Sequence, residues 1–128
     1  MAIPLKTVAI AEDDPGVIKL LEAVVNHLGY QCAGAARQGA EAIQLVQQAQ
    51  PNLILMDVHM PEMGGIEALK EMRSMRPEQK IAMFSSGSDP SYFLEKEALK
   101  NGAVEYLLKP VELSDIDRII HETAGTAC

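Results

Sequence analysis

Short apolar runs alternate with segments of helical periodicity along the whole chain. Each run has the length of a β-strand, and the residues after it repeat their apolar positions at intervals of three and four, as in a helix with one buried face. Strands are predicted at Thr7–Ala11, Gln31–Ala36, Leu53–Met56, Ile81–Phe84 and Glu105–Leu108. Helices are predicted at 15–28, Ala40–Ala49, Ile66–Met75, Ser91–Lys100 and Leu113–Thr123.

The first predicted helix has clear signals at both ends. Asp14 precedes Pro15, which suits an N-cap followed by proline at the first helical position. Gly29 is typical of the residue that follows a helix C-terminus. On the last helix we expect one apolar face, formed by Leu113, Ile116 and Ile120.

Alternation of strand and helix at this spacing indicates βαβ units. Their right-handed crossovers build a parallel sheet that is covered on both faces. The length of 128 residues suits one domain. We therefore expect residues 1–128 to form a single α/β domain with a doubly wound five-stranded sheet.

Composition narrows the class of protein. Hydrophobic residues make up 48% and charged residues 23%, as in a globular protein, and the formal charge of −7 disfavours nucleic-acid binding. No apolar run reaches the roughly 20 residues of a membrane helix, and the N-terminus lacks the apolar core of a signal peptide. We expect a cytoplasmic protein without membrane contact, in which Cys32 and Cys128 are reduced thiols.

Polar groups follow the predicted strands, at the sheet edge where parallel α/β proteins bind ligands. The second strand contributes only small residues and Arg37. The other strands end in Glu12-Asp13-Asp14, Asp57, Ser85-Ser86 and Lys109-Pro110. Each has an ordinary alternative, because Asp and Ser also begin loops and cap helices. Asp14 is expected to cap the first helix, and Ser86 or Ser88 could help to begin another.

The three acidic side chains expected at this edge require a counter-ion. Two carboxylates about 4 Å apart repel by roughly 4 kcal/mol at an effective dielectric constant near 20. Lys109 can neutralise one charge, and a hard divalent cation with oxygen ligands, Mg²⁺ above all, suits the remainder. Such an ion also binds phosphate oxygens, so the cluster points to phosphoryl chemistry.

Four motifs together resemble the bacterial response-regulator receiver domain over essentially the whole chain. They are VAIAEDDP, LILMDVHMP followed by GG, MFSS and GAVEYLLKP. The resemblance implies a flavodoxin-like sheet with strand order 2-1-3-4-5 and a signalling switch controlled by phosphorylation.

The resemblance also implies roles for individual residues. Asp57 is the expected phosphoacceptor. Asp13 is expected to bind Mg²⁺ directly, together with Asp57 and the backbone carbonyl of His59, whereas Glu12 helps mostly through water. Lys109 is expected to pair with Asp57 and later with the phosphoryl group.

Two further positions are expected to form the switch. Ser85 would hydrogen-bond a phosphoryl oxygen, and the rotamer of Tyr106 would follow Ser85. The Lys109–Pro110 peptide bond is expected to be cis. The chain departs from the usual family pattern at Asn52, Gly64 and Val111, and the family varies its dephosphorylation rate at His59 and Gly87.

The implied partners are a sensor histidine kinase or histidine phosphotransfer protein, and a downstream target or fused effector domain. The chain would catalyse its own phosphorylation and dephosphorylation, although its role is regulatory. One alternative is an aspartyl-phosphate phosphatase, which usually needs a second aspartate where His59 stands. Another is a pseudo-receiver that only binds partners, and a flavodoxin-like cofactor binder is disfavoured by the lack of Trp. The output, including transcriptional regulation, stays open.

Other candidates have simpler interpretations. His27 and His121 are expected at the surface or at helix ends. The methionines are expected in core or loop packing. Lys70, Arg73 and Arg76 are expected to form a solvated basic face on the third helix.

Overall fold

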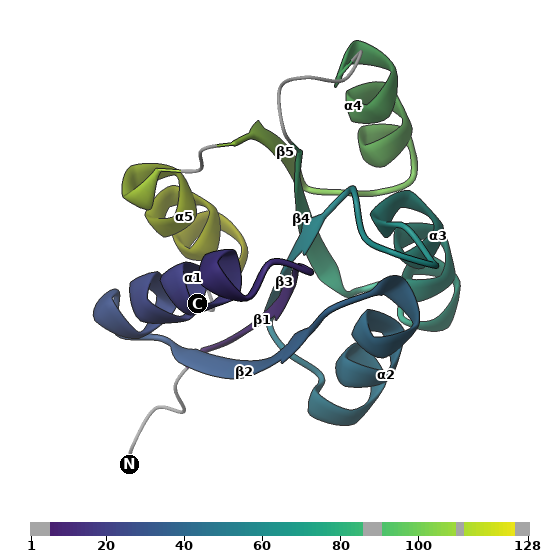
Figure 1. Ribbon diagram of the computed structural model, residues 1–128. Helices are drawn as coiled ribbons and strands as arrows, with labels where there is room; N and C mark the ends of the chain where they lie inside the picture. Colours follow the sequence, from purple (N-terminus) through teal and green to yellow (C-terminus); the bar gives the residue numbers. More distant parts are fainter. Residues whose placement is uncertain (1–5, 86–90, 110–111, 125–128) are drawn as a thin grey trace.

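The computed structural model describes residues 6–85, 91–109 and 112–124. Five parallel strands form one sheet in the order β2-β1-β3-β4-β5 (Figure 1). They are β1 (Thr7–Ala11), β2 (Gln31–Ala36), β3 (Leu53–Asp57), β4 (Lys80–Ser85) and β5 (Glu105–Leu108). The doubly wound architecture and the strand order expected from the sequence are both confirmed.

Helices cover both faces of the sheet. The helices α1 (Pro15–His27) and α5 (Leu113–Ile119) lie on one face, and α5 continues as a π-helical turn, η1 (Ile120–Ala124). The opposite face carries α2 (Gly39–Ala49), α3 (Gly65–Met75) and α4 (Ser91–Lys100) (Figure 1). No helix among the described residues is both long and apolar enough to cross a membrane.

Successive residues of each central strand enter opposite core layers. In β3, Ile54 and Met56 join the apolar cluster beneath α2, α3 and α4. Leu53 and Leu55 join the cluster beneath α1 and α5. Because strand side chains alternate between faces, a strand that is covered on both sides is apolar without interruption. All five residues of β3 are buried, which explains its continuous apolar run.

The predicted end signals of α1 are confirmed, although the helix ends at His27, one residue earlier than predicted. One carboxylate oxygen of Asp14 accepts hydrogen bonds from the backbone N–H groups of Gly16 and Val17, at 2.8 and 3.4 Å. These bonds satisfy donors that the first turn of a helix leaves unpaired. Gly29 follows the helix at φ +91°, a conformation that glycine adopts without steric cost.

The structure corrects two details of the helix predictions. The helices α2 and α3 begin one residue earlier than predicted, at Gly39 and Gly65, because apolar periodicity does not register a glycine. Leu113 was expected to share one apolar face with Ile116 and Ile120, but Leu113 is 48% exposed, whereas the two isoleucines are buried. Leu113 is the first residue of the helix. The buried face is formed by Ile116, Ile119 and Ile120.

The prediction of a solvated basic face on α3 is wrong for Arg73. Its guanidinium donates hydrogen bonds to the backbone carbonyls of Gly102 at 2.8 Å and Gln79 at 3.2 Å, and also to the carbonyl of Pro77. Arg73 therefore fastens the end of α3 to the turns before β4 and β5. Lys70, with a side chain 53% exposed, fits the prediction.

Candidate functional site

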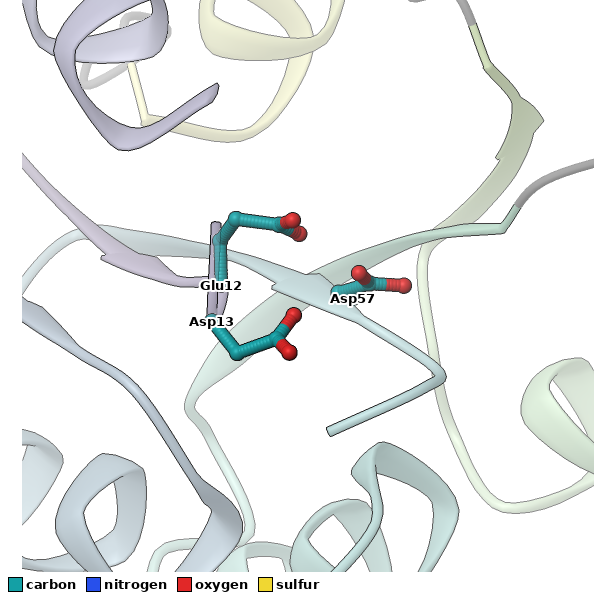
Figure 2. A group of neighbouring side chains, drawn as sticks. All are labelled: Glu12, Asp13 and Asp57. Atoms are coloured by element: carbon teal, nitrogen blue, oxygen red, sulfur yellow. The ribbon is translucent and has the colours of Figure 1, made fainter. Parts of the chain in front are cut away.

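Three carboxylates meet at the carboxyl edge of the sheet (Figure 2). Glu12 and Asp13 follow β1 directly, and Asp57 is the last residue of the neighbouring strand β3. One oxygen from each carboxylate lies within 4.8 Å of the others. Glu12 and Asp57 are buried, whereas Asp13 is exposed. The predicted acidic cluster is confirmed, with two members in the protein interior and one at its mouth.

Lys109 connects the two buried carboxylates. Its Nζ lies 3.0 Å from Asp57 Oδ2 and 3.2 Å from Glu12 Oε2. The lysine follows β5 directly, and its backbone N–H donates to the carbonyl of Ser85 at 2.7 Å. The predicted pairing with Asp57 is confirmed, and the contact with Glu12 was not foreseen. Lys109 therefore brings one positive charge to a group of three carboxylates.

Burial makes Glu12 a much weaker acid than an ordinary glutamate. Desolvation raises its pKa from 4.5 to about 8, helped by its hydrogen bond with Asp57 and by the charge of Asp57. Lys109 opposes the shift but does not cancel it. Burial also acts to lower the pKa of Lys109, yet hydrogen bonds and attraction from Asp57 and Glu12 outweigh it and raise that pKa. In the absence of a metal, a proton on Glu12 relieves the excess negative charge.

The donor set suits a hard divalent cation. Carboxylate oxygens are the ligands that Mg²⁺ and Ca²⁺ prefer, and Mg²⁺ commonly uses one or two of them beside water. Asp13 lies at the mouth of the cluster and is exposed. A hydrated ion could therefore reach its carboxylate and exchange a bound water for one of its oxygens. The backbone N–H of His59 donates to Asp57 Oδ1 at 3.1 Å, which fixes the orientation of that carboxylate.

Close backbone approaches hold the loop after β3 in place. The N–H of Gly65 donates to the carbonyl of Val58, and a Cβ on Gly65 would lie 2.2 Å from the carbonyl oxygen of Asp57. The N–H of Gly39 donates to the carbonyl of Met63 at 2.9 Å, so α2 also supports this loop. Glycine at position 65 thus allows α3 to begin against the backbone of Asp57.

The two residues predicted to form a switch lie on adjacent strands. Ser85 ends β4, is buried, and pairs in register with Leu108 of β5. Tyr106 of β5 is partly buried against the cluster beneath α2, α3 and α4. Within the described part of the chain its buried hydroxyl has no hydrogen-bond partner. Their proposed roles stay predictions.

The structure adds Arg37, whose role the sequence did not indicate. Arg37 follows β2, and its Nη2 donates to the backbone carbonyl of Asp13 at 3.2 Å. Its backbone N–H donates to Glu41 Oε1 at 2.9 Å. A long side chain at the end of a strand has no periodic signature, so only its position next to the cluster could have suggested this contact.

The remaining cysteine, histidine and methionine predictions can be compared with the structure. Cys32 is a free thiol on β2, and His27 and His121 are exposed, as expected. The predicted methionine packing is confirmed for Met56, Met72 and Met83, which are buried in the core. The predictions for Cys128, Ser86, Gly87, Ser88, Val111 and the Lys109–Pro110 bond lie outside the described residues.

Solved structures share this architecture. A CheY-like response regulator receiver domain protein from Methanospirillum hungatei is 28% identical, with a TM-score of 0.83 and 93% of each chain covered. The receiver domain of a sensor histidine kinase from Pseudomonas aeruginosa, solved with a magnesium ion coordinated in its active-site cleft, has a TM-score of 0.84. It covers 96% of this chain and 100% of its own at 23% identity, a likeness that shows the fold alone.

Sequence comparisons agree with the fold. The chemotaxis protein CheY of Thermotoga maritima is 31% identical over 119 residues, which cover 93% of this chain and 98% of that protein. Other curated relatives are longer regulatory proteins, of which the chain spans between 24% and 54%. The family model of the response regulator receiver domain matches residues 8–121. With the acidic cluster and Lys109 at the carboxyl edge of a 2-1-3-4-5 sheet, the chain belongs to the response regulator receiver domain family.

Proposed function

We propose that this chain is a phosphorylation-dependent switch of a two-component system, with Asp57 as the phosphoacceptor. The observation that carries the proposal is the contact of Lys109 Nζ with Asp57 Oδ2 at 3.0 Å, beside the acidic pair Glu12 and Asp13. A carboxylate held by a cation next to a candidate metal site suits transfer of a phosphoryl group to that carboxylate.

Magnesium is the proposed cofactor, since receiver domains typically hold Mg²⁺ at an acidic site. Asp13, Asp57 and the backbone carbonyl of His59 would hold the ion, with Glu12 acting mainly through water. When bound, the ion would neutralise charge on the phosphoryl oxygens. The fit rests on the hard oxygen donors of the cluster and on its single lysine counter-charge.

The remaining steps are assigned to side chains of the chain itself. A carboxylate oxygen of Asp57 attacks phosphorus of a phosphohistidine, and the bond to the imidazole nitrogen breaks, leaving an acyl phosphate. Lys109 stabilises negative charge on the transferred group. Ser85 donates a hydrogen bond to a phosphoryl oxygen. The same site later admits water, which attacks phosphorus, breaks the bond to the Asp57 oxygen, releases inorganic phosphate and restores the carboxylate.

The proposed output is a shift between two conformations. Ser85 moves to the phosphoryl oxygen, Tyr106 fills the space beside it, and the face formed by α4, β5 and α5 changes. Exposed apolar side chains on this face support partner binding there: Phe93, Leu99 and Leu108. A histidine kinase or phosphotransfer protein supplies the phosphoryl group, and a target protein or effector domain reads the result.

Single-domain organisation is part of the proposal, supported by one sheet with two core layers. A cytoplasmic location stays a prediction.

The test is incubation with acetyl phosphate and Mg²⁺, followed by intact-protein mass spectrometry. The wild-type chain is expected to gain one phosphoryl group and Asp57→Asn none. Asp14→Asn is the matched control, because it alters a nearby carboxylate that caps α1 and is expected to leave phosphorylation intact. Absence of the added mass in the wild type, or its presence in Asp57→Asn, would contradict the proposal.

A further inference from the structure

The guanidinium of Arg37 holds the main chain of Asp13. Its Nη2 donates to the backbone carbonyl of Asp13 at 3.2 Å, across the gap between the ends of β2 and β1. The backbone of Arg37 is fixed in turn, because its N–H donates to Glu41 Oε1 on α2 at 2.9 Å. The contact therefore links Asp13 to a residue that is anchored on a separate helix.

Asp13 needs such support more than its two neighbours do. Asp57 belongs to a buried strand, and Glu12 is buried and tied to β2 through its N–H, which donates to the carbonyl of Ala36 at 2.9 Å. Asp13 lies beyond these ties, exposed, in the loop before α1. Figure 2 shows its side chain turned toward Asp57 from the opposite side of the cluster to Glu12.

Two effects of Arg37 on a bound cation have opposite signs. Its positive charge repels the cation, but solvent screens an exposed charge, so this effect is about twofold in affinity or less. Orientation of a ligand acts the other way. Groups that orient metal ligands commonly change affinity by about 10–100-fold when removed. Because Arg37 contacts the backbone of Asp13 and leaves its carboxylate untouched, the lower end of that range applies.

We infer that Arg37 is a positioning residue for the metal site, which holds Asp13 in the orientation that binds Mg²⁺. The inference rests on the proposed function, since it concerns the same ion. It goes beyond that function by assigning a role to a cation that is not itself a ligand. Net loss of affinity on removing a positive charge is the signature that separates positioning from simple electrostatics.

The test measures Mg²⁺ dissociation constants by isothermal titration calorimetry, on the full chain at one fixed pH. Arg37→Met removes the charge and the donors but keeps most of the aliphatic stem, and it is expected to weaken binding about tenfold. Arg37→Lys keeps one donor and the charge. Because the native contact uses a single nitrogen, Lys is expected to restore most of the affinity.

The matched control is Arg118→Ala, which removes a guanidinium paired with Glu105 at the opposite end of β5 from the acidic cluster. Its Mg²⁺ affinity should equal that of the wild type. Unfolding midpoints measured in EDTA provide a second readout. Arg37→Met should match the wild type in EDTA, while the rise in midpoint on adding Mg²⁺ should shrink.

Each other outcome contradicts the inference. Equal or tighter Mg²⁺ binding by Arg37→Met would mean that only charge acts, and failure of Arg37→Lys to recover would exclude the hydrogen bond. A lower midpoint in EDTA with an unchanged dissociation constant would make Arg37 merely structural. If the wild type itself does not bind Mg²⁺, the proposed function fails as well. If the wild type binds Mg²⁺ and Arg37→Met binds it with the same affinity, the inference fails and the proposed function stands.

Discussion

The ammonium group of Lys109 lies 3.0 Å from the carboxylate of Asp57, although 52 residues separate them in the chain. It also lies 3.2 Å from Glu12, so a single side chain joins the ends of three strands. The site is therefore an ion cluster with Lys109 as the cation between two carboxylates, and the balance of charge within it determines how it responds to protons and to metal.

Lys109→Met is expected to separate stability from metal affinity. Without the ammonium, the buried carboxylate of Asp57 loses its counter-charge while Glu12 holds a proton, and the metal-free protein should lose roughly 3 kcal/mol of unfolding free energy near neutral pH. Mg²⁺ binding should tighten, because a competing cation is gone. Urea denaturation in EDTA and a Mg²⁺ titration measure the two effects. Lys19→Met, an exposed lysine of α1, is the control and should change neither. Weaker Mg²⁺ binding by Lys109→Met would contradict this account of the cluster.

Stability of the metal-free protein is expected to fall as pH rises. The pKa of Glu12 is about 8 in the folded protein against 4.5 ordinarily, so between these values the folded state holds the extra proton. The stabilisation is complete below the lower value and is lost as pH passes the higher one, at no more than about 1.4 kcal/mol per pH unit. Glu12→Gln should flatten this slope in urea denaturation across pH. Equal slopes for both proteins would exclude Glu12 as the source.

Adjacent glycines before and within α3 are expected to differ sharply in tolerance. A Cβ on Gly65 would lie 2.2 Å from the carbonyl oxygen of Asp57, a backbone atom that cannot move aside, so Gly65→Ala should cost about 1–3 kcal/mol or more. It should also impair phosphorylation. At Gly64 the nearest atom is 3.5 Å away, an ordinary contact. Gly64→Ala is therefore the control, within about 0.5 kcal/mol of the wild type. Similar unfolding free energies for the two variants would contradict the prediction.

Arg73 is expected to contribute to stability well beyond a surface arginine. Arg73→Met leaves three backbone carbonyls without their donor, and we expect a loss of about 1–3 kcal/mol in urea denaturation. Arg73→Lys should recover only part, because one ammonium cannot reproduce the fork of a guanidinium. Lys70→Met, on the same helix, should stay within about 0.5 kcal/mol of the wild type. A similar small effect for Arg73→Met would show that water replaces these contacts.

The fold could be predicted from the sequence because its signals are local. Strand and helix periods alternate cleanly, and the continuous apolar run of Leu53–Met56 follows from burial on both faces. The predicted starts of α2 and α3 were one residue late. Gly39 and Gly65 begin these helices in close contact with backbone that is distant in sequence, and such a contact does not affect the periodicity of apolar residues. The exposure of Leu113 could not be predicted, because periodicity defines an apolar stripe but not where along it burial begins.

The acidic cluster and Lys109 were foreseen because parallel strands end at a shared edge. The contacts of Lys109 with Glu12, of Arg37 with Asp13 and of Arg73 with Gly102 were not foreseen. A long cationic side chain can reach several partners from one position. Which of them it contacts depends on how the loops of different βα units pack against one another. Nothing in the local sequence specifies that choice.

The burial of β3 also determines how its last residue can respond to change. Amides of a central strand, hydrogen-bonded on both sides and shielded by two core layers, exchange with solvent only when the whole domain opens. We therefore expect the slowest hydrogen exchange of the protein in Leu53–Met56. Fraying of this strand cannot relieve the strain that a group added to Asp57 would cause. That strain must therefore be taken up by the surrounding loops and by the ends of the neighbouring strands.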